Sequence, residues 1–250
     1  MNSTANQPQP CSQHGEDLLV WDYCGGQCNG FFIQVGANHL TDLSLTWWLE
    51  QRGGHGLLVD PLPGRCAPIR AARPNSIGWE AAAGAPNQVD EALLQVTKAD
   101  AWSRLSKLED PNAAAEKIRV QVRPLDSFCD EPRAPQVDFL AIDVAGMEVQ
   151  VLAGLDLARR RPALVLLEDH LNGIDQELCL RRAGYRLIKR TGCNNWGLPA
   201  RAKRPPRPLP RSSACGTACC SANRSANCAA CSAARVEAHD CTPHFLPQRI

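Results

Sequence analysis

The stretch that most constrains the fold is a short apolar run that ends in a turn of small residues. Phe31–Val35 is rich in aromatic and β-branched residues, which is typical of a strand buried on both faces. Gly36 and Ala37 follow and predict a tight turn, and Ser44 is a candidate N-cap for a helix over residues 45–49. In α/β sheets, a unit of this kind presents backbone N–H groups to a nucleotide-like ligand at the carboxyl end of its first strand.

A second strand is predicted at residues 56–59, and it ends at Asp60, about two dozen residues after the turn. A carboxylate at this place can accept hydrogen bonds from both hydroxyls of a ribose. Further along, residues 81–84 predict a small-residue turn, where a flat ring could lie close to the backbone of Ala81 and Ala82. The sequence therefore predicts a nucleotide-like ligand. From the residues alone, its candidate contacts are Gly36, Ala37, Asp60, Ala81 and Ala82.

The remaining pattern alternates strands with helices. We expect further strands at 75–79, 118–122, 137–143, 163–167 and 185–189, and helices at 18–21, 65–73, 124–128, 147–152 and 175–183. Residues 86–117 are patterned loosely and are interpreted as an insertion with weak helices. This alternation predicts an α/β fold with one doubly wound, mostly parallel sheet.

Three regions differ in composition. Residues 1–10 are polar and are expected to be disordered, and residues 11–198 form the folded domain. Residues 199–250 form a low-complexity tail, first basic and Pro-rich and then rich in Cys, Ala and Ser. From residue 201 onward there are eight Lys or Arg against two Asp or Glu, so the preceding part carries a net charge of −5. The mildly acidic domain gives no electrostatic reason to expect nucleic acid.

Targeting signals are not apparent. The chain has no run of about 18 apolar residues, so no membrane span is expected. The first residues lack the basic start and apolar core of a secretory signal, which predicts a cytoplasmic protein with reduced cysteines. Six of the 13 cysteines lie in the tail, where Cys228 and Cys231 have metal-ligand spacing. The tail has few apolar residues and its spacing fits no common zinc finger, so we expect no metal site.

Several motifs in order resemble the FkbM-type family of S-adenosylmethionine-dependent methyltransferases. The matching stretches are 12–17, 30–39, 56–61, 73–76, 125–126, 138–155 and 190–196. The resemblance implies a Rossmann-like, class I methyltransferase sheet, S-adenosylmethionine as cofactor, and usually O-methylation of a hydroxyl. The expected acceptor is a small molecule or a glycan. The resemblance also implies that Gln34, Asn38, Pro61 and Asp143 contact the cofactor, in addition to the candidates named above.

Four positions depart from the family pattern, and one of them is Leu40, which replaces a common Gly. Gln34 stands where the family usually has an acid, Ala141 where it often has Lys, and Ala145 where it often has Glu. A rival hypothesis is therefore a catalytically degenerate module that keeps the fold and binds S-adenosylmethionine or acts as a scaffold.

A sulfonium methyl group is already activated, so its transfer depends mainly on alignment with the acceptor. A hydroxyl acceptor must also lose its proton, which favours a nearby general base. The candidates at strand ends are His39, Asp143 and Glu168, with His170 beside them. Each has a structural alternative, because Asp143 could cap the next helix, Glu168 and His170 could be surface loop residues, and His39 could bond to backbone. Gln13, Glu16 and Asp17 are either part of the site wall or a helix N-terminus.

Overall fold

The computed structural model describes residues 10–25, 30–39, 41, 43–88, 90–96, 104–106, 116–169 and 174–202. Leu40, His170 and the cysteine-rich tail lie outside the described residues. So do residues 1–9, which are nearly all of the segment predicted to be disordered. The helices are α1 (Glu16–Tyr23), α2 (Trp47–Glu50), α3 (Cys66–Ala72), α4 (Leu125–Asp130), α5 (Glu148–Ala153), α6 (Leu157–Arg160) and α7 (Ile174–Arg182). The strands are β1 (Phe31–Val35), β2 (His55–Asp60), β3 (Ser76–Glu80), β4 (Ala82–Gly84), β5 (Asp90–Val96), β6 (Arg104–Ser106), β7 (Glu116–Pro124), β8 (Phe139–Ile142), β9 (Leu164–Glu168), β10 (Tyr185–Thr191) and β11 (Asn194–Pro199).

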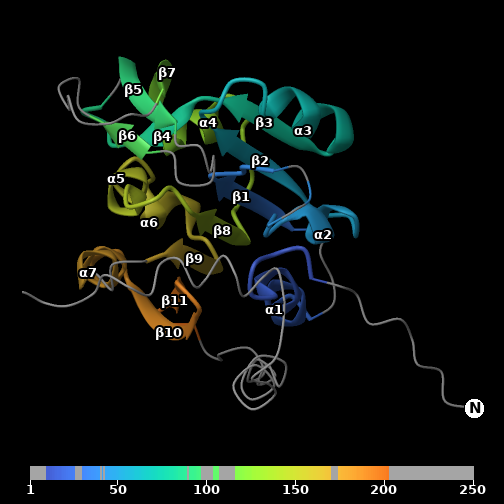
Figure 1. Cartoon of the computed structure of the whole chain (residues 1–250). Helices are drawn as coiled ribbons and strands as arrows, with labels where there is room; N and C mark the ends of the chain where they lie inside the picture. The colour runs from blue at the N-terminus through green and yellow to red at the C-terminus, as the bar shows by residue number, and fades with distance from the viewer. Residues whose placement is uncertain are drawn as a thin grey trace, which may run out of the picture. The chain divides into compact units, whose positions relative to one another are not determined.

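Seven strands form the main sheet, in the order β10-β11-β9-β8-β1-β2-β3 (Figure 1). The pairs from β9 through β8, β1 and β2 to β3 are parallel, and β11 is antiparallel to both of its neighbours. The predicted doubly wound, mostly parallel sheet is thus confirmed. The chain builds outward from β1 in one direction through β2 and β3, and in the other through β8 and β9. The strand order therefore reverses between β1 and β8, and such a switch point opens a crevice at the carboxyl ends of the strands.

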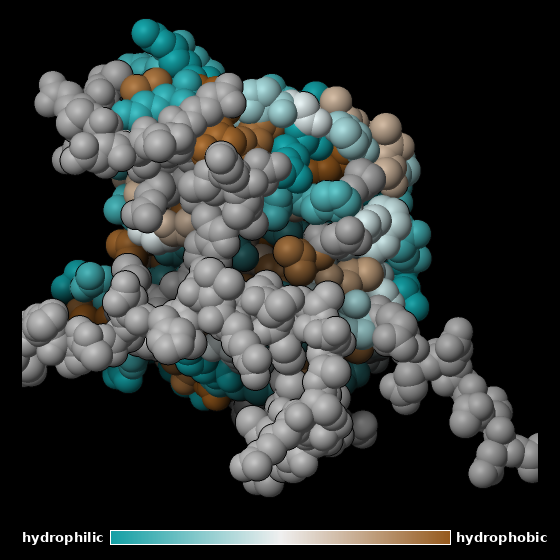
Figure 2. Space-filling view, viewed as in Figure 1, coloured by the Kyte–Doolittle hydropathy of each residue, from teal (hydrophilic) through white to brown (hydrophobic). Residues whose placement is uncertain are grey.

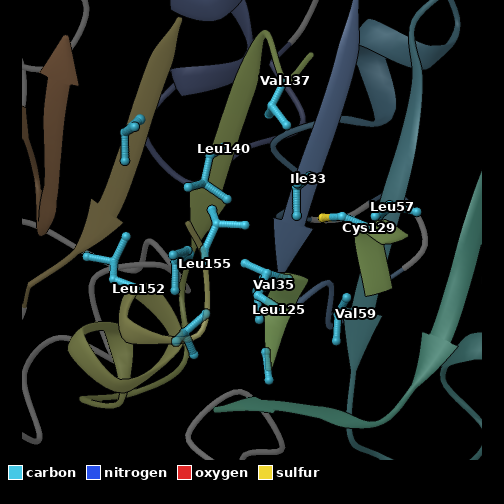
Figure 3. Packing of buried hydrophobic residues seen from close by; sticks show 14 of the residues in the cluster. Ile33, Val35, Leu57, Val59, Leu125, Cys129, Val137, Leu140, Leu152 and Leu155 are labelled. Carbon is cyan, nitrogen blue, oxygen red and sulfur yellow. The ribbon is translucent and has the colours of Figure 1, made fainter. Parts of the chain in front are cut away.

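Both faces of this sheet are covered, which explains the apolar runs in its central strands. Ile33 and Val35 of β1 pack with Leu57 and Val59 of β2 against Leu125 of α4 (Figure 3). The alternate residues of the same strands point to the other face, where they pack against α1, α2 and α3. That second cluster includes Phe32, Leu58, Leu19, Leu49 and Ile69.

A second sheet, in the order β4-β7-β5-β6, was not expected. The weak helices predicted for residues 86–117 are wrong over β5 and β6, and the small-residue turn predicted near residue 82 is strand β4. The alternation of Ala92, Leu94 and Val96 carries the signal for a half-buried strand. On the outer side, Arg119 bonds to exposed Glu91, and hydrophilic residues lie beside hydrophobic ones at the upper left of the view (Figure 2).

One boundary and two further elements also differ from the prediction. The first helix after β1 begins at Trp47 rather than at residue 45, although the Ser44 hydroxyl accepts the N–H of Trp47 at 3.1 Å, as a capping residue would. Strand β11 and the short helix α6 had no counterpart in the sequence prediction. None of the helices among the described residues combines the length and the apolar character needed for a bilayer crossing.

Candidate active site

A cavity of about 270 Å³ lies at the carboxyl ends of the central strands, where the strand order reverses. The residues that line it come from the segment around the start of α1, from the strands β1, β2, β9 and β11, from the second sheet, and from the β8–α5 loop. The lining residues are Gln13, Glu16, Gln34, Val35, Gly36, Asn38, Leu43, Leu45, Asp60, Pro61, Leu62, Ala81, Ala82, Ala83, Leu94, Asp143, Val144, Ala145, Met147, Glu168 and Asn194.

The strand register places the polar lining residues in one row. Val35 pairs with Val59 and with Ile142, and Ile142 pairs with Leu167, so the next position in each strand also lines up. That next row contains Asp60, Gly36, Asp143 and Glu168, and Asn194 continues it because it pairs directly with Glu168. Three strand spacings separate β2 from β9, which is about 14 Å at about 4.8 Å per spacing. The row is long enough for an elongated ligand.

Gly36 is the point where two strands leave no room for a side chain. Its φ is 80°, and a Cβ placed there would lie 1.8 Å from the backbone oxygen of Asp143. The N–H groups of Gly36 and Ala37 both donate to the carbonyl of Val59, at 2.9 and 3.2 Å. The N–H of Asn38 donates to Asp60 Oδ2 at 2.6 Å. The expectation that this turn presents these three N–H groups to a ligand is therefore wrong, and the turn instead supplies space.

Asp60 supports the turn from the end of β2. Its side chain is buried, and its second oxygen, Oδ1, accepts the N–H of Leu62 at 2.9 Å. Arg65 closes the arrangement by donating to the carbonyl of Asn38 at 3.1 Å. Burial raises the pKa of Asp60, and the two backbone N–H groups and Arg65 oppose that rise. Each carboxylate oxygen keeps a lone pair beyond its backbone bond, so Asp60 can accept two further hydrogen bonds from the cavity.

Gln34 is held by a chain of hydrogen bonds that ends in a buried ion pair. Arg73 donates to the Thr46 hydroxyl at 2.9 Å, and that hydroxyl donates to Gln34 Oε1 at 2.6 Å. Arg73 also contacts Glu50 at 2.5 Å, and both of these side chains are only 1% exposed. Because its oxygen is bound to Thr46, Gln34 is left with its amide N–H groups for the cavity. Its register partner on β8 is Ala141, so two of the departures from the family pattern are neighbours.

Asp143 and Glu168 form a carboxyl pair on the opposite side of Gly36 from Asp60. A hydrogen bond joins their side chains, and Glu168 also accepts the N–H of Ala145. Burial, together with the nearby charge of Glu148, raises the pKa of Glu168 against these two hydrogen bonds. Glu148 in turn accepts the N–H groups of Val144 and Gly146, at 3.2 and 3.0 Å, and so fixes the loop that carries Asp143.

The loop before α1 and the β10–β11 hairpin close the cavity beside this pair. Glu16 is fully buried, and its Oε1 accepts from Asn194 Nδ2 at 2.9 Å and from the Thr191 hydroxyl at 3.3 Å. His14 packs against Gly192, where a Cβ would lie 2.2 Å from the His14 ring. Glu16 lines the cavity and is also the first residue of α1, so the site-wall and helix-terminus interpretations both apply to it.

The other end of the cavity is apolar. Leu62, Ala82 and Leu94 belong to one hydrophobic cluster with residues of β7, and all three line the cavity. The N–H of Ala81 donates to the backbone oxygen of Asp60 at 3.1 Å, which keeps this shelf next to the carboxylate. The arrangement suits a flat ring joined to a ribose.

The cavity brings together most of the predicted site residues. Of the candidate cofactor contacts, Gln34, Gly36, Asn38, Asp60, Pro61, Ala81, Ala82 and Asp143 line it, and so does the candidate base Glu168. Ala37 does not, because its side chain packs into the core with Leu45. His39 is exposed and outside the lining.

Sequence reasoning gave no site role to Asn194, Met147 or Leu94. Leu94 lies in the unexpected second sheet. Asn194 begins the unexpected strand β11, and only the family motif around residues 190–196 drew attention to it.

Cys193 lies next to the cavity, where its sulfur is 4.0 Å from Glu168 Oε1. Burial and the charges of Glu168 and Asp143 raise the pKa of the Cys193 thiol to about 11, so it is not a thiolate nucleophile at neutral pH. Within the described ranges, no group of three or more His, Cys, Asp or Glu side chains is arranged to hold a metal ion.

Comparison with known proteins gives a family. Residues 34–187 match the Methyltransferase FkbM domain, which is more than half of the chain. No curated protein matches the chain.

Among solved structures, the chain is similar to a precorrin-6y C5,15-methyltransferase from Geobacter metallireducens GS-15, at 11% identity and a TM-score of 0.42, over 77% of this chain and 93% of that one. It is also similar to a TehB-like SAM-dependent methyltransferase from Corynebacterium glutamicum ATCC 13032 Kitasato, at 10% identity and a TM-score of 0.39, over 75% and 86% of the two chains.

The cofactor of such an enzyme is S-adenosylmethionine, and the residues present suit it. Gly36 has no side chain and so leaves room for the ligand. Asp60 keeps lone pairs that can accept hydrogen bonds from hydroxyl groups. Leu62, Ala82 and Leu94 form an apolar surface in the same cavity. The sequence match and the fold lead to one conclusion: this chain belongs to the FkbM family of S-adenosylmethionine-dependent methyltransferases.

Proposed function

We propose that this methyltransferase methylates a hydroxyl oxygen of a small molecule or a glycan. The observation that carries the proposal is the Asp143–Glu168 carboxyl pair, which lies in the same cavity row as Asp60. A hydroxyl acceptor has to lose a proton when its oxygen gains the methyl group, and this pair is a proton acceptor at the right edge of the sheet.

The cofactor-facing residues have separate roles in this proposal. The Asp60 carboxylate holds the ribose hydroxyls, and Pro61, Ala81 and Ala82 flank the adenine. Gly36, Asn38 and Gln34 border the methionyl part, with Gly36 providing space rather than a contact. Ala37 acts only through its backbone, which shapes the turn.

S-adenosylmethionine supplies a methyl group on a positively charged sulfur, which makes the carbon reactive toward an oxygen nucleophile. In the transfer an O–CH₃ bond forms, the S–CH₃ bond breaks, and the sulfur leaves as the neutral thioether of S-adenosylhomocysteine. With both carboxyl groups ionised, Glu168 takes the hydroxyl proton, and the pair later gives it to solvent. Exposed Asp143 gives the pair that route to water, while buried Glu168 keeps its pKa raised.

The proposal is tested with methyl-¹³C S-adenosylmethionine and a small-molecule and oligosaccharide extract as the acceptor source. The expected result is a product whose carbon shift is that of a methyl ether and whose label survives mild alkali. A label on nitrogen, or one released by alkali as from a carboxyl ester, would contradict methylation of a hydroxyl while leaving methyl transfer intact. Heat-denatured protein is the control for chemical methylation.

A further inference from the structure

A hydrogen-bond relay of four side chains connects the interior of the protein to the cavity beside β1. Glu50 and Arg73 form its inner end, and both side chains are only 1% exposed. Thr46 is the next member and is fully buried, and Gln34 is the last member and lines the cavity. Buried polar side chains that are bonded in sequence hold one another in fixed orientations. The relay therefore determines which atoms of Gln34 face a ligand.

The ion pair at the inner end fixes the direction of the Arg73 guanidinium. Glu50 Oε2 accepts from Arg73 Nε at 2.5 Å and from the Ser76 hydroxyl at 2.8 Å. On the other side of the guanidinium, Arg73 Nη1 donates to the Ser44 hydroxyl at 3.3 Å, and Nη2 donates to the Thr46 hydroxyl at 2.9 Å. The planar guanidinium is thus held on both sides, and one of its donors points at Thr46.

The Thr46 hydroxyl in turn orients the amide of Gln34. Because an arginine can only donate, this hydroxyl accepts from Arg73 and keeps its own proton for another acceptor. Its oxygen lies 2.6 Å from Gln34 Oε1, which is within the range of an O–H···O bond and shorter than the usual N–H···O bond of about 2.7–3.2 Å. Gln34 Oε1 therefore faces Thr46, and the amide N–H groups are the donors that Gln34 offers to the cavity.

An amide donor at this place distinguishes the two charged groups of the methionyl part. The α-carboxylate accepts hydrogen bonds, whereas the α-ammonium group only donates them. A Gln34 N–H can therefore bond to the carboxylate, and a bond to an ionised group is stronger than one between neutral groups. A carboxylate side chain at the same position would prefer the ammonium group. The positive charge of Arg73 favours the carboxylate as well, because linked hydrogen bonds polarise one another.

We infer that Thr46 is a positioning residue for cofactor binding. With Arg73 behind it, Thr46 turns the amide of Gln34 so that an N–H group donates to the carboxylate of the methionyl part. The inference rests on the proposed placement of Gln34 beside the methionyl part, and it does not depend on which acceptor is methylated. It gives a binding role to a buried hydroxyl that does not itself line the cavity.

The test is calorimetric titration with S-adenosylhomocysteine and two analogues, in which a hydrogen replaces either the α-carboxylate or the α-amino group. Thr46→Val exchanges the hydroxyl for a methyl group of similar size. We expect it to weaken S-adenosylhomocysteine and the analogue without the amino group about five- to ten-fold. Its affinity for the analogue without the carboxylate should change less than about two-fold. Thr46→Ser keeps the hydroxyl and should restore the affinities of the parent.

A second substitution shows whether Thr46 acts through Gln34. Gln34→Met removes the amide and should cause the same carboxylate-dependent loss. The double variant of Thr46→Val and Gln34→Met should lose no more than Gln34→Met alone, because both residues act on one contact.

Ser127→Ala is the matched control. The Ser127 hydroxyl also accepts from an arginine, Arg123 at 3.2 Å, and it donates to a backbone carbonyl at 2.8 Å, but Ser127 does not line the cavity. All three affinities of this variant should equal those of the parent. Thermal unfolding verifies that each variant is folded, since Thr46→Val also leaves a buried donor of Arg73 without its acceptor. If Thr46→Val does not fold, Thr46→Cys takes its place with the same expectation, because a thiol is only a weak hydrogen-bond donor.

The outcomes separate this inference from the proposed function. The inference is overturned if folded Thr46→Val, or folded Thr46→Cys in its place, binds S-adenosylhomocysteine as tightly as the parent. A loss that is equal for all three compounds, or that follows the amino group, overturns it too, and so do additive losses in the double variant. A parent protein that binds none of the three compounds would overturn the cofactor site together with the inference. A methyl label found on nitrogen would contradict the proposed acceptor chemistry alone.

Discussion

The carboxyl groups of Asp143 and Glu168 are hydrogen-bonded to each other across the ends of two neighbouring parallel strands. The titrations of two such neighbouring groups are coupled, so the pair loses its protons in two steps. Burial of Glu168 raises its pKa, and the neighbouring Glu148 carboxylate acts in the same direction. The pair can therefore accept a proton at a higher pH than an ordinary carboxylate, which suits a general base.

The first prediction concerns the pH dependence of turnover. The base works when ionised, and its pKa is raised, so kcat/KM should fall as the pH drops through a value above about 4.3, the ordinary pKa of Glu. Glu168→Gln should lower kcat by about 10²–10⁴-fold and move this acid limb, while affinity for S-adenosylhomocysteine changes less than about three-fold. Steady-state kinetics across pH give the profile.

Glu177→Gln is the control for that prediction, because Glu177 lies on α7 in an ion pair with exposed Arg181. If Glu168→Gln leaves the pH profile and kcat unchanged, Glu168 takes no part in the proton transfer.

The second prediction concerns the charge next to the methionyl part. Gln34→Glu still accepts the Thr46 hydroxyl and adds a negative charge at the cavity wall. Because S-adenosylmethionine carries one more positive charge than S-adenosylhomocysteine, the ratio of their affinities should shift several-fold toward S-adenosylmethionine. The shift should shrink at high salt.

Calorimetric titrations at two salt concentrations measure this ratio, and Gln34→Met controls for loss of the amide. The same ratio in Gln34→Glu and in the parent would show that position 34 does not sense the sulfonium charge.

The third prediction concerns stability beneath the cavity. Arg73 and Glu50 are a buried ion pair, and Glu50 also accepts from the Ser76 hydroxyl at 2.8 Å. Glu50→Gln leaves the Arg73 charge buried and uncompensated, which should lower the free energy of unfolding by about 3–5 kcal/mol. Denaturant titration measures the change.

The matched control is Glu91→Gln, which breaks an ion pair whose side chains are 78% and 52% exposed. That variant should lower the free energy of unfolding by at most about 1 kcal/mol. If both variants lower the free energy of unfolding equally, the buried pair does not stabilise the loop that contains Thr46, the hydrogen-bond partner of Gln34.

The sequence predicted the main sheet because its signals are local. Apolar runs such as Phe31–Val35 mark strands covered on both faces, and the acid at the end of β2 marks the cavity edge. The second sheet escaped prediction because β4 contains only three small residues, whose strand character comes from pairing with β7 far along the chain.

Part of the candidate site was also predicted, because its signals are local in the sequence. Asp60 and Glu168 follow apolar strands and could be placed from position alone. Asn194 could not, because its role depends on the antiparallel pairing of β11 with β9 and on a contact with Glu16, 178 residues away. Likewise, the hydrogen bonds that occupy the N–H groups of the Gly36 turn arise from the neighbouring strand and not from the turn sequence.

The central claim is that this cavity holds S-adenosylmethionine with its ribose on Asp60. Asp60 also anchors Asn38 and Leu62, so Asp60→Ala should lower stability by about 1–3 kcal/mol as well as weaken cofactor binding. Glu80→Gln is the control, because Glu80 is nearby on β3 but does not line the cavity.

Isothermal titration calorimetry with S-adenosylmethionine and S-adenosylhomocysteine is the most direct test. The account predicts one site per chain for both compounds in the parent and in Glu80→Gln, and at least about ten-fold weaker binding in folded Asp60→Ala. Folded parent protein that binds neither compound, or folded Asp60→Ala that binds both as tightly as the parent, would contradict it.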